Sequence, residues 1–162
     1  CSGLELAFVQ KKEGLGLLLN GEDITDRIRT AEITMLASAI SARPVVRECL
    51  LVLQRNLGKE KAAVFEGRDM GTVVFPEADL KFFLDASRQS RTLRRYDEIK
   101  SKSSQTLEEV GLDMQRRDRD DSTRELAPLQ PAEDAIRVDS TDLSVTEVVE
   151  LMVSHTHKFS EL

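Results

Sequence analysis

The chain has 162 residues and a formal net charge of −6, with 40% hydrophobic and 32% charged residues. This length suits one domain with a sizeable core, and the acidic balance excludes a generic nucleic-acid-binding protein, whose surface is basic. No run of about 18 apolar residues occurs, so we expect no membrane span. Two cysteines are too few for the disulfide framework of a small secreted protein, and we therefore expect a cytoplasmic location.

The chain opens with short β-like runs. Leu4 to Val9 and Leu15 to Leu19 favour strands, and "EDIT" at 22–25 adds a third short piece. The Asn20-Gly21 dipeptide between the last two is a hairpin-turn signal. The sequence therefore predicts a small antiparallel unit.

Two helices are predicted next. Thr30 to Ser41 has apolar residues at helical spacing. Pro44 suits the first position of a second helix, which Gly58 ends.

Three later apolar runs favour β-strands, namely Ala62–Phe65, Leu80–Leu84 and Ala135–Val138. The expected helices are Ser87 to roughly Lys102, Leu107 to Asp120, and Val145 to His155 with Ser144 as its N-cap. Two of the strands are followed by helical segments, which is typical of a parallel sheet covered by helices. We therefore expect an α/β fold.

A phosphate-binding loop of the form G-x-x-x-x-G-K-[ST] does not occur in the sequence. The Gly58-Lys59 pair has Leu53 in place of the first glycine and Glu60 in place of the hydroxyl residue. The histidines at 155 and 157 point to different sides of an expected helix, and no His, Cys and carboxylate cluster has metal-ligand spacing. No metal site is predicted.

The segment "RRDRDDSTR" places Arg117, Asp121 and Arg124 at i, i+4 and i+7, which is one face of a helix. Two interpretations are open. Such a row can be a surface ion-pair ladder, with each pair contributing about 0.3–0.5 kcal/mol. Alternatively, two guanidiniums can hold a phosphate bidentately while the carboxylate accepts from sugar hydroxyls. Spacing alone favours the ion-pair ladder.

The loop "FEGRDMGTVVFP" places Arg68 and Asp69 between Gly67 and Gly71, directly after the expected strand Ala62–Phe65. Ligands of open parallel sheets bind beyond the carboxyl ends of the strands, and glycines allow a close backbone approach. A surface turn with a local ion pair is the competing interpretation. Position and composition together support a binding site at least as well as they support a surface turn.

Basic residues gather in 88–102, which holds Arg88, Arg91, Arg94, Arg95, Lys100 and Lys102 against Asp97 and Glu98. A local basic patch on an acidic protein suits a small anionic ligand better than a polymer. From charge alone, a solvated helix face is the favoured interpretation.

Six segments together resemble bacterial cytidylate kinase, the (d)CMP kinase family of P-loop nucleoside monophosphate kinases. They are "LNGEDITDRIRT", "ASAISARPVVRE", "EGRDMGTVVFP", "KFFLDAS", "RRDRDDSTRELAPL" and "IRVDSTDLSVTEVVE", and they cover nearly the whole chain in order. The resemblance implies a P-loop kinase-type parallel sheet with covering helices, a small antiparallel β insert and a helical lid. Residues 1–60 would form the monophosphate-binding region and 61–162 the rest of the kinase core, with the lid at about 88–124.

The resemblance also implies roles for individual residues, carried over position by position. Ser38, Arg47 and Asp69 match the residues that recognise the cytosine ring. Arg68 and Arg124 match the arginines that hold the monophosphate, with Arg117 close by, and Asp121 matches the carboxylate that contacts the sugar. Arg94 and Arg95 resemble lid arginines that act in catalysis together with Arg68 and Arg124. Glu66, also a substrate-binding position, stands where the family more often has Asp.

The implied reaction is transfer of the ATP γ-phosphoryl group to CMP or dCMP, a step of pyrimidine nucleotide metabolism, with Mg²⁺ accompanying ATP. The implied partners are these small nucleotides, without nucleic acid or membrane, and the protein is expected to be a monomer. The family begins with a strand, a phosphate loop and a helix that do not occur in these residues. We therefore expect a truncated kinase. The alternative is a non-catalytic cytidine-nucleotide-binding module.

Overall fold

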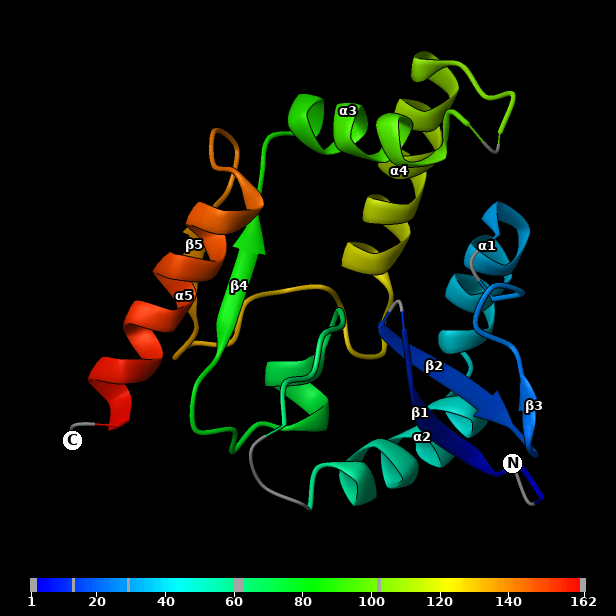
Figure 1. The fold of residues 1–162 in the computed structure, drawn as a ribbon, viewed down its shortest axis with the longest axis vertical. Helices are drawn as coiled ribbons and strands as arrows, with labels where there is room; N and C mark the ends of the chain where they lie inside the picture. The colour runs from blue at the N-terminus through cyan, green and yellow to red at the C-terminus, as the bar shows by residue number, and fades with distance from the viewer. Residues whose placement is uncertain (1–2, 13, 29, 60–62, 102, 161–162) are drawn as a thin grey trace. The chain divides into compact units, whose positions relative to one another are not determined.

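The computed structural model describes residues 3–12, 14–28, 30–59, 63–101 and 103–160 (Figure 1). Contacts divide the chain into two compact units, Cys1–Lys59 and Glu60–Leu162. In the described ranges, no helix combines the length and apolar character needed to cross a membrane.

The first unit contains a three-stranded antiparallel sheet in the order β1-β2-β3, with bounds Leu6–Lys11, Gly14–Leu19 and Glu22–Asp23. Phe8 lies opposite Leu17 in this register. The turn between β2 and β3 is formed by Asn20 and Gly21, whose φ angles of 50° and 82° are the left-handed values that a tight hairpin turn needs. The predicted antiparallel unit and its turn are confirmed.

Two helices complete the first unit, α1 at Ala31–Ser41 and α2 at Pro44–Leu57. The Thr30 hydroxyl accepts a hydrogen bond from the Ile33 amide at 3.2 Å and so satisfies a free donor at the start of α1. Pro44 occupies the first turn of α2, where its missing amide costs no helical bond, and Gly58 caps the end. Both predicted helices are confirmed.

The second unit is an α/β arrangement built on the parallel pair β4 and β5 (Figure 1). Its elements are the π-helical turn η1 (Met70–Val74), β4 (Phe82–Asp85), α3 (Arg88–Ile99), α4 (Leu107–Thr123), β5 (Ile136–Asp139) and α5 (Val145–Ser160). The crossover from β4 to β5 runs through α3 and α4, as parallel neighbours require. The predicted α/β class is confirmed.

Reciprocal capping boxes begin two of these helices. The Thr106 hydroxyl accepts from the Glu109 amide, and the Glu109 carboxylate accepts from the Thr106 amide at 2.7 Å. Ser144 and Glu147 repeat the arrangement at the start of α5, where the carboxylate accepts from the Ser144 amide at 2.8 Å. Ser144 is therefore confirmed as the N-cap.

The prediction of a strand at Ala62–Phe65 is wrong for the residues that the structure describes, since 63–65 have no regular structure. A strand needs a neighbour to satisfy its backbone amides and carbonyls, and the described parallel sheet consists of β4 and β5 only. The Val64 side chain is 98% exposed, so burial does not hold this run in place. Phe65 packs against Phe75, with ring centroids 4.6 Å apart.

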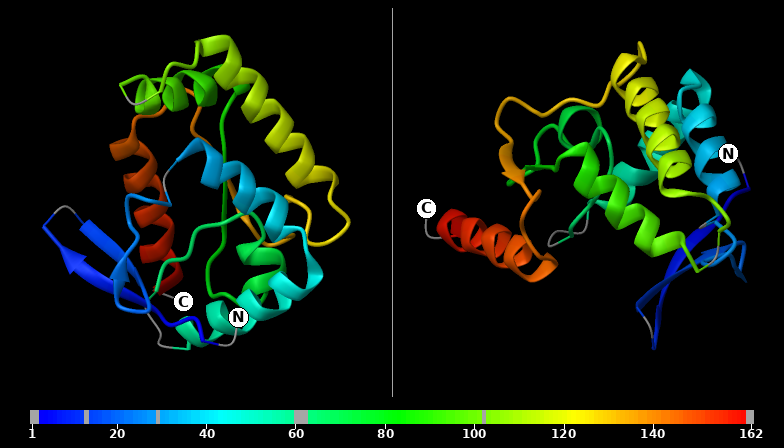
Figure 2. Two further views of the ribbon diagram at one scale, coloured as in Figure 1. Left: turned by 90° about the vertical axis from the view of Figure 1, so that its right-hand side faces the viewer. Right: turned by 90° about the horizontal axis from the view of Figure 1, so that it is seen from above.

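Four buried apolar residues mark the core of the second unit: Val74, Ala86, Val110 and Val138. They come from η1, the residue that follows β4, α4 and β5, so the core joins the sheet to η1 and α4. Helices α3 and α4 lie side by side (Figure 2). A Cβ added at Gly111 of α4 would lie 3.4 Å from the Thr92 side chain of α3. This packing sets the position of the basic helix α3 against α4.

Candidate functional site

Asp121, in the last turn of α4, is the centre of an arginine cluster in the second unit. The residue is only 4% exposed. Its Oδ2 atom lies 3.2 Å from Arg68 Nε and 3.8 Å from Arg117 Nε. Its Oδ1 atom lies 3.7 Å from NH1 of Arg124, the residue that caps α4. A buried carboxylate needs such partners, because desolvation penalises an uncompensated charge.

Asp69 brings a second carboxylate to the same cluster. It precedes η1, and its backbone oxygen accepts from the amides of Val73 and Val74 at 2.9 and 3.2 Å, which closes the π-helical turn. This turn buries Asp69, which is 7% exposed, and sets its Oδ1 atom 3.9 Å from Arg124 NH2. Single π-helical turns are frequent at functional sites.

Arg68 and Asp69, adjacent in sequence, face different partners, with Arg68 against Asp121 and Asp69 against Arg124. The premise that they follow a buried strand is wrong, as shown above. The loop is instead placed by η1 and by these ion pairs to α4. It joins the predicted row Arg117, Asp121 and Arg124 in one cluster, which we call the arginine–aspartate cluster.

Two donors of this cluster are buried without a hydrogen bond in the described part of the chain, Arg117 Nε and Arg124 NH2. Their carboxylate neighbours lie 3.8 and 3.9 Å away, beyond hydrogen-bond range. Buried polar groups are normally paired, so such donors call for an explanation, and an anionic ligand would supply acceptors. Burial, and next the adjacent Arg68 guanidinium, lower the pKa of Arg117 from its ordinary value.

Arg94 has other partners in this structure. Its guanidinium donates to the backbone oxygens of Ser140 at 2.5 Å and Leu143 at 3.1 Å, and to the Ser140 hydroxyl at 3.1 Å. These bonds fasten α3 to the loop between β5 and α5. The predicted contact of Arg94 with a transferring phosphoryl group stays a prediction.

Arg95 pairs with Glu98 at 2.8 Å, one turn along α3. The positive charge of Arg95 also contributes, after burial and Arg68, to lowering the pKa of Arg117. Sequence reasoning missed the ion pair that joins the two helices, between Arg91 NH1 and Asp118 Oδ2 at 2.5 Å. No local spacing signals a contact between residues so far apart in the chain.

The remaining predicted site residues lie apart from these contacts or in the other unit. Glu66 is exposed in the loop before Arg68. Arg47 lies in α2 of the first unit and donates from NH1 to the Ser41 carbonyl at 3.3 Å. Ser38 lies in α1, and its side chain falls outside the described residues. Their role toward a base stays a prediction.

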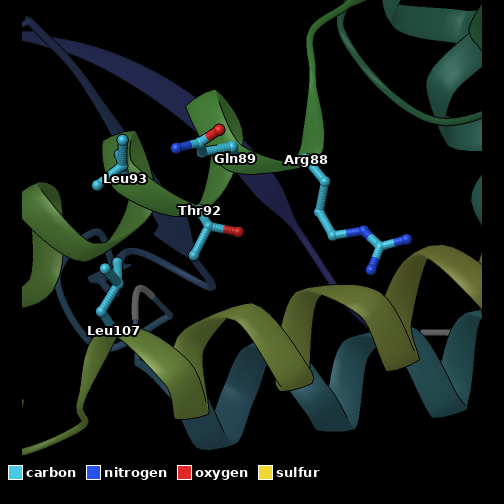
Figure 3. Close-up of a pocket in the computed structure, with 5 residues that line it drawn as sticks. All are labelled: Arg88, Gln89, Thr92, Leu93 and Leu107. Atoms are coloured by element: carbon cyan, nitrogen blue, oxygen red, sulfur yellow. The ribbon is translucent and has the colours of Figure 1, made fainter.

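A separate hollow of about 360 Å³ opens between α3 and the start of α4 (Figure 3). Its lining consists of Arg88, Gln89, Thr92 and Leu93 of α3 with Leu107 of α4. None of these five is a predicted site residue. The charged cluster, with its buried donors, is therefore the better candidate for a functional site.

The described residues hold no group of three His, Cys, Asp or Glu side chains placed to bind a metal ion. In the arginine–aspartate cluster, each carboxylate already faces guanidiniums. A divalent cation does not fit there, because it would be added to a locally positive environment.

The cytidylate kinase family model matches residues 2–158 of the chain. The chain belongs to the cytidylate kinase family. A cytidylate kinase of Geobacter sulfurreducens is 52% identical over 155 residues, covering 95% of this chain and 66% of the relative. A cytidylate kinase of Citrifermentans bemidjiense is 50% identical over 155 residues with the same coverage, and one of Pasteurella multocida is 40% identical over 162 residues, covering 99% of this chain and 71% of the relative.

The chain thus spans about two thirds of the length of several cytidylate kinases that it matches. Membership in the cytidylate kinase family confirms the resemblance found in the six sequence segments.

Sequence reasoning also missed a residue that contacts Arg124. The Ala127 carbonyl accepts a hydrogen bond from Arg124 Nε at 2.6 Å. No residue pattern signalled this contact, because it depends on a backbone carbonyl and on a φ of 51° at Ala127, which the following proline does not favour.

Proposed function

We propose that the arginine–aspartate cluster binds the monophosphate and sugar of CMP or dCMP, in a protein that transfers the ATP γ-phosphoryl group to that nucleotide. The observation that carries the proposal is the pair of buried, unbonded arginine donors, Arg117 Nε and Arg124 NH2. Family membership supports the choice of nucleotide. The product would be CDP or dCDP.

Each part of the cluster suits one part of the nucleotide. The guanidiniums of Arg68, Arg117 and Arg124 present planar donor pairs that match phosphate oxygens. Asp121, as a hydrogen-bond acceptor, suits a sugar hydroxyl. Asp69 suits the exocyclic amine of cytosine, and it would repel uracil, which has an acceptor at that position.

The first unit would complete base recognition. Ser38 and Arg47 carry donors for the ring acceptors of cytosine, and Glu66 would contact the substrate from the loop of the second unit. We assign residues 1–60 to the region that binds the nucleoside monophosphate through its base, and 61–162 to the rest of the kinase core, with a lid at about 88–124.

Phosphoryl transfer would depend on positioning and charge neutralisation, since this reaction requires little covalent chemistry from a protein. Arg68 and Arg124 would hold the acceptor phosphate, while Arg95 and Arg94 of α3 would face the transferring group. Mg²⁺ is expected to come with ATP, on the ATP phosphates. The cluster does not fit a metal ion, so no step is assigned to one here.

The sequence carries no phosphate-binding loop, and this observation favours a second candidate, a CMP-binding module without catalysis. A coupled assay for ADP release with ATP, Mg²⁺ and CMP separates the two. The assay is run on this chain and on the chain extended by its own upstream coding sequence. Activity of either form supports the kinase, whereas saturable CMP binding without ADP release from both supports the module.

Two further expectations, a monomer and a cytoplasmic location, stay predictions. Sedimentation of the purified chain tests the first, and fractionation of the source cell tests the second. CMP binding to neither the chain nor its extended form would contradict the proposed function as a whole.

A further inference from the structure

The segment after α4 folds back onto the last turn of that helix. The Leu129 amide donates to the Asp121 carbonyl at 2.7 Å, and the Arg124 amide donates to the Asp120 carbonyl at 3.1 Å. Between them, Arg124 Nε donates to the Ala127 carbonyl at 2.6 Å. Three hydrogen bonds therefore define a small loop from 124 to 129 around the Arg124 side chain.

Ala127 adopts an unusual backbone conformation in this loop, with a φ of 51°. Left-handed values are uncommon for residues other than glycine and asparagine, and the structure around them must compensate for their cost. Here the conformation turns the Ala127 carbonyl toward Arg124 Nε. The residue with the unfavourable φ therefore accepts a hydrogen bond from an arginine of the candidate site.

The bond at Nε also determines what the rest of the guanidinium can do. Because the group is planar, fixing Nε fixes the directions of NH1 and NH2. NH1 then lies 3.7 Å from Asp121 and NH2 lies 3.9 Å from Asp69, and NH2 is buried without a hydrogen bond in the described residues. The Arg124 side chain is 10% exposed, so it has little freedom to turn.

We propose that Ala127 is a positioning residue, whose left-handed backbone holds Arg124 so that NH1 and NH2 are presented to the phosphate of the nucleotide. The inference rests on the proposed function for its ligand. It adds that the orientation of Arg124, and not its charge alone, is required for binding. Ala127 itself touches no ligand.

A double-mutant cycle in the 162-residue chain tests this, with the dissociation constant for CMP measured by calorimetry. Ala127→Val introduces a β-branched residue that disfavours φ near 50°, and we expect CMP binding about five- to tenfold weaker. In the Arg124→Ala background the same substitution is expected to change binding less than twofold, because its effect passes through Arg124. Equal weakening in both backgrounds would overturn the proposal.

Two further variants keep the test decisive if Ala127→Val folds poorly. Ala127→Gly keeps the carbonyl and removes the strain, so CMP binding should stay within about twofold of wild type while the melting temperature rises. Arg124→Lys keeps the charge but lacks the Nε–H donor, so its binding should fall nearly to the level of Arg124→Ala. Wild-type affinity in Arg124→Lys would overturn the proposal.

Ala132→Val is the matched control, since it makes the same substitution in the connection from α4 to β5, outside the loop 124–129 and at a residue whose φ is not positive. It should leave the CMP affinity within about twofold. The wild-type titration separates a failure of the proposed function from a failure of the proposed role of Ala127. Absence of CMP binding from both the wild-type chain and its extended form contradicts the proposed function, whereas wild-type binding with an additive cycle contradicts only the role of Ala127.

Discussion

Asp121 is a buried carboxylate that faces the guanidinium groups of three arginines. Arg68 approaches to 3.2 Å, while Arg117 and Arg124 approach to 3.8 and 3.7 Å. Buried ion pairs often contribute little net stability, but removal of one partner leaves the others uncompensated. The cluster is therefore sensitive to neutralisation of its central acid.

Asp121→Asn should lower the free energy of unfolding by about 2 kcal/mol, below the usual cost of breaking a buried pair because Arg68 is partly exposed. Urea denaturation followed by circular dichroism measures the change. Asp120→Asn is the matched control, since this neighbour is exposed, and it should change the free energy by less than about 0.5 kcal/mol. Equal losses in both variants would contradict the central place of Asp121.

The sequence predicted part of this cluster. Helical spacing put Arg117, Asp121 and Arg124 on one face, and the structure brings them together, although Arg124 already has extended backbone as the C-cap. Spacing could not reveal that Arg68 and Asp69 reach the same point, because that depends on η1 and on tertiary packing. It also could not distinguish a surface ladder from a buried cluster, because burial is a property of the whole fold.

The arginines of helix α3 contribute both to the packing of the second unit and to the candidate site. Arg94 bonds the loop at 140–143, Arg91 bonds Asp118 of α4, and Arg95 lies where its charge acts on Arg117. The helix is thus fastened by two arginines. A third arginine, Arg95, pairs with Glu98 on its own helix.

Arg94→Ala should therefore lower the unfolding free energy by about 2 kcal/mol, since hydrogen bonds from a charged donor contribute roughly 1.5–3 kcal/mol. Arg95→Ala is the adjacent control and should cost less than about 0.5 kcal/mol, because its helical pair with Glu98 is partly exposed. Thermal and urea unfolding of both variants provide the comparison. A larger loss in Arg95→Ala than in Arg94→Ala would contradict the fastening role.

The capping box of α5 predicts a pH dependence. Hydrogen bonds from the Ser144 side chain and then its backbone lower the pKa of Glu147 from 4.5. A carboxyl group whose folded pKa is depressed adds stability above its unfolded pKa, and this contribution is lost as pH falls through the folded value. Glu147→Gln should therefore melt below wild type at pH 7, and the difference should shrink as the pH falls below about 4.5.

Scanning calorimetry of both proteins from pH 7 to pH 3 makes this measurement. Glu150→Gln removes a negative charge from an exposed position of the same helix and serves as the control. A Glu147→Gln deficit that stays constant over the whole range would contradict the assigned hydrogen bonds.

Helix ends were more predictable than strands. Pro44, Gly58 and Ser144 act as expected, because helix ends depend on a few neighbouring residues. The run Ala62–Phe65 has the composition of a strand, but β structure requires a partner, and none pairs with 63–65 in the described sheet. The runs at Leu80–Leu84 and Ala135–Val138 do pair with each other as β4 and β5, so composition predicted a strand correctly where a neighbouring strand pairs with it.

At the scale of the whole molecule, family membership and the arginine–aspartate cluster support the same function by separate routes. The family model matches residues 2–158, while the cluster presents buried donors suited to an anion. The fold class was predictable from alternating strand and helix patterns together with the six family-like segments. The positions of Arg94 and Ala127 were not, because both depend on backbone carbonyls that no residue pattern displays.

We infer that this chain binds CMP through the arginine–aspartate cluster. Calorimetric titration of the chain with CMP and with UMP tests it most directly, with Asp69→Asn measured in parallel. We expect CMP to bind at least about tenfold more tightly than UMP, and the ratio to be smaller in Asp69→Asn, which no longer offers a carboxylate to the cytosine amine. Equal affinities of the wild-type chain for CMP and UMP would contradict it.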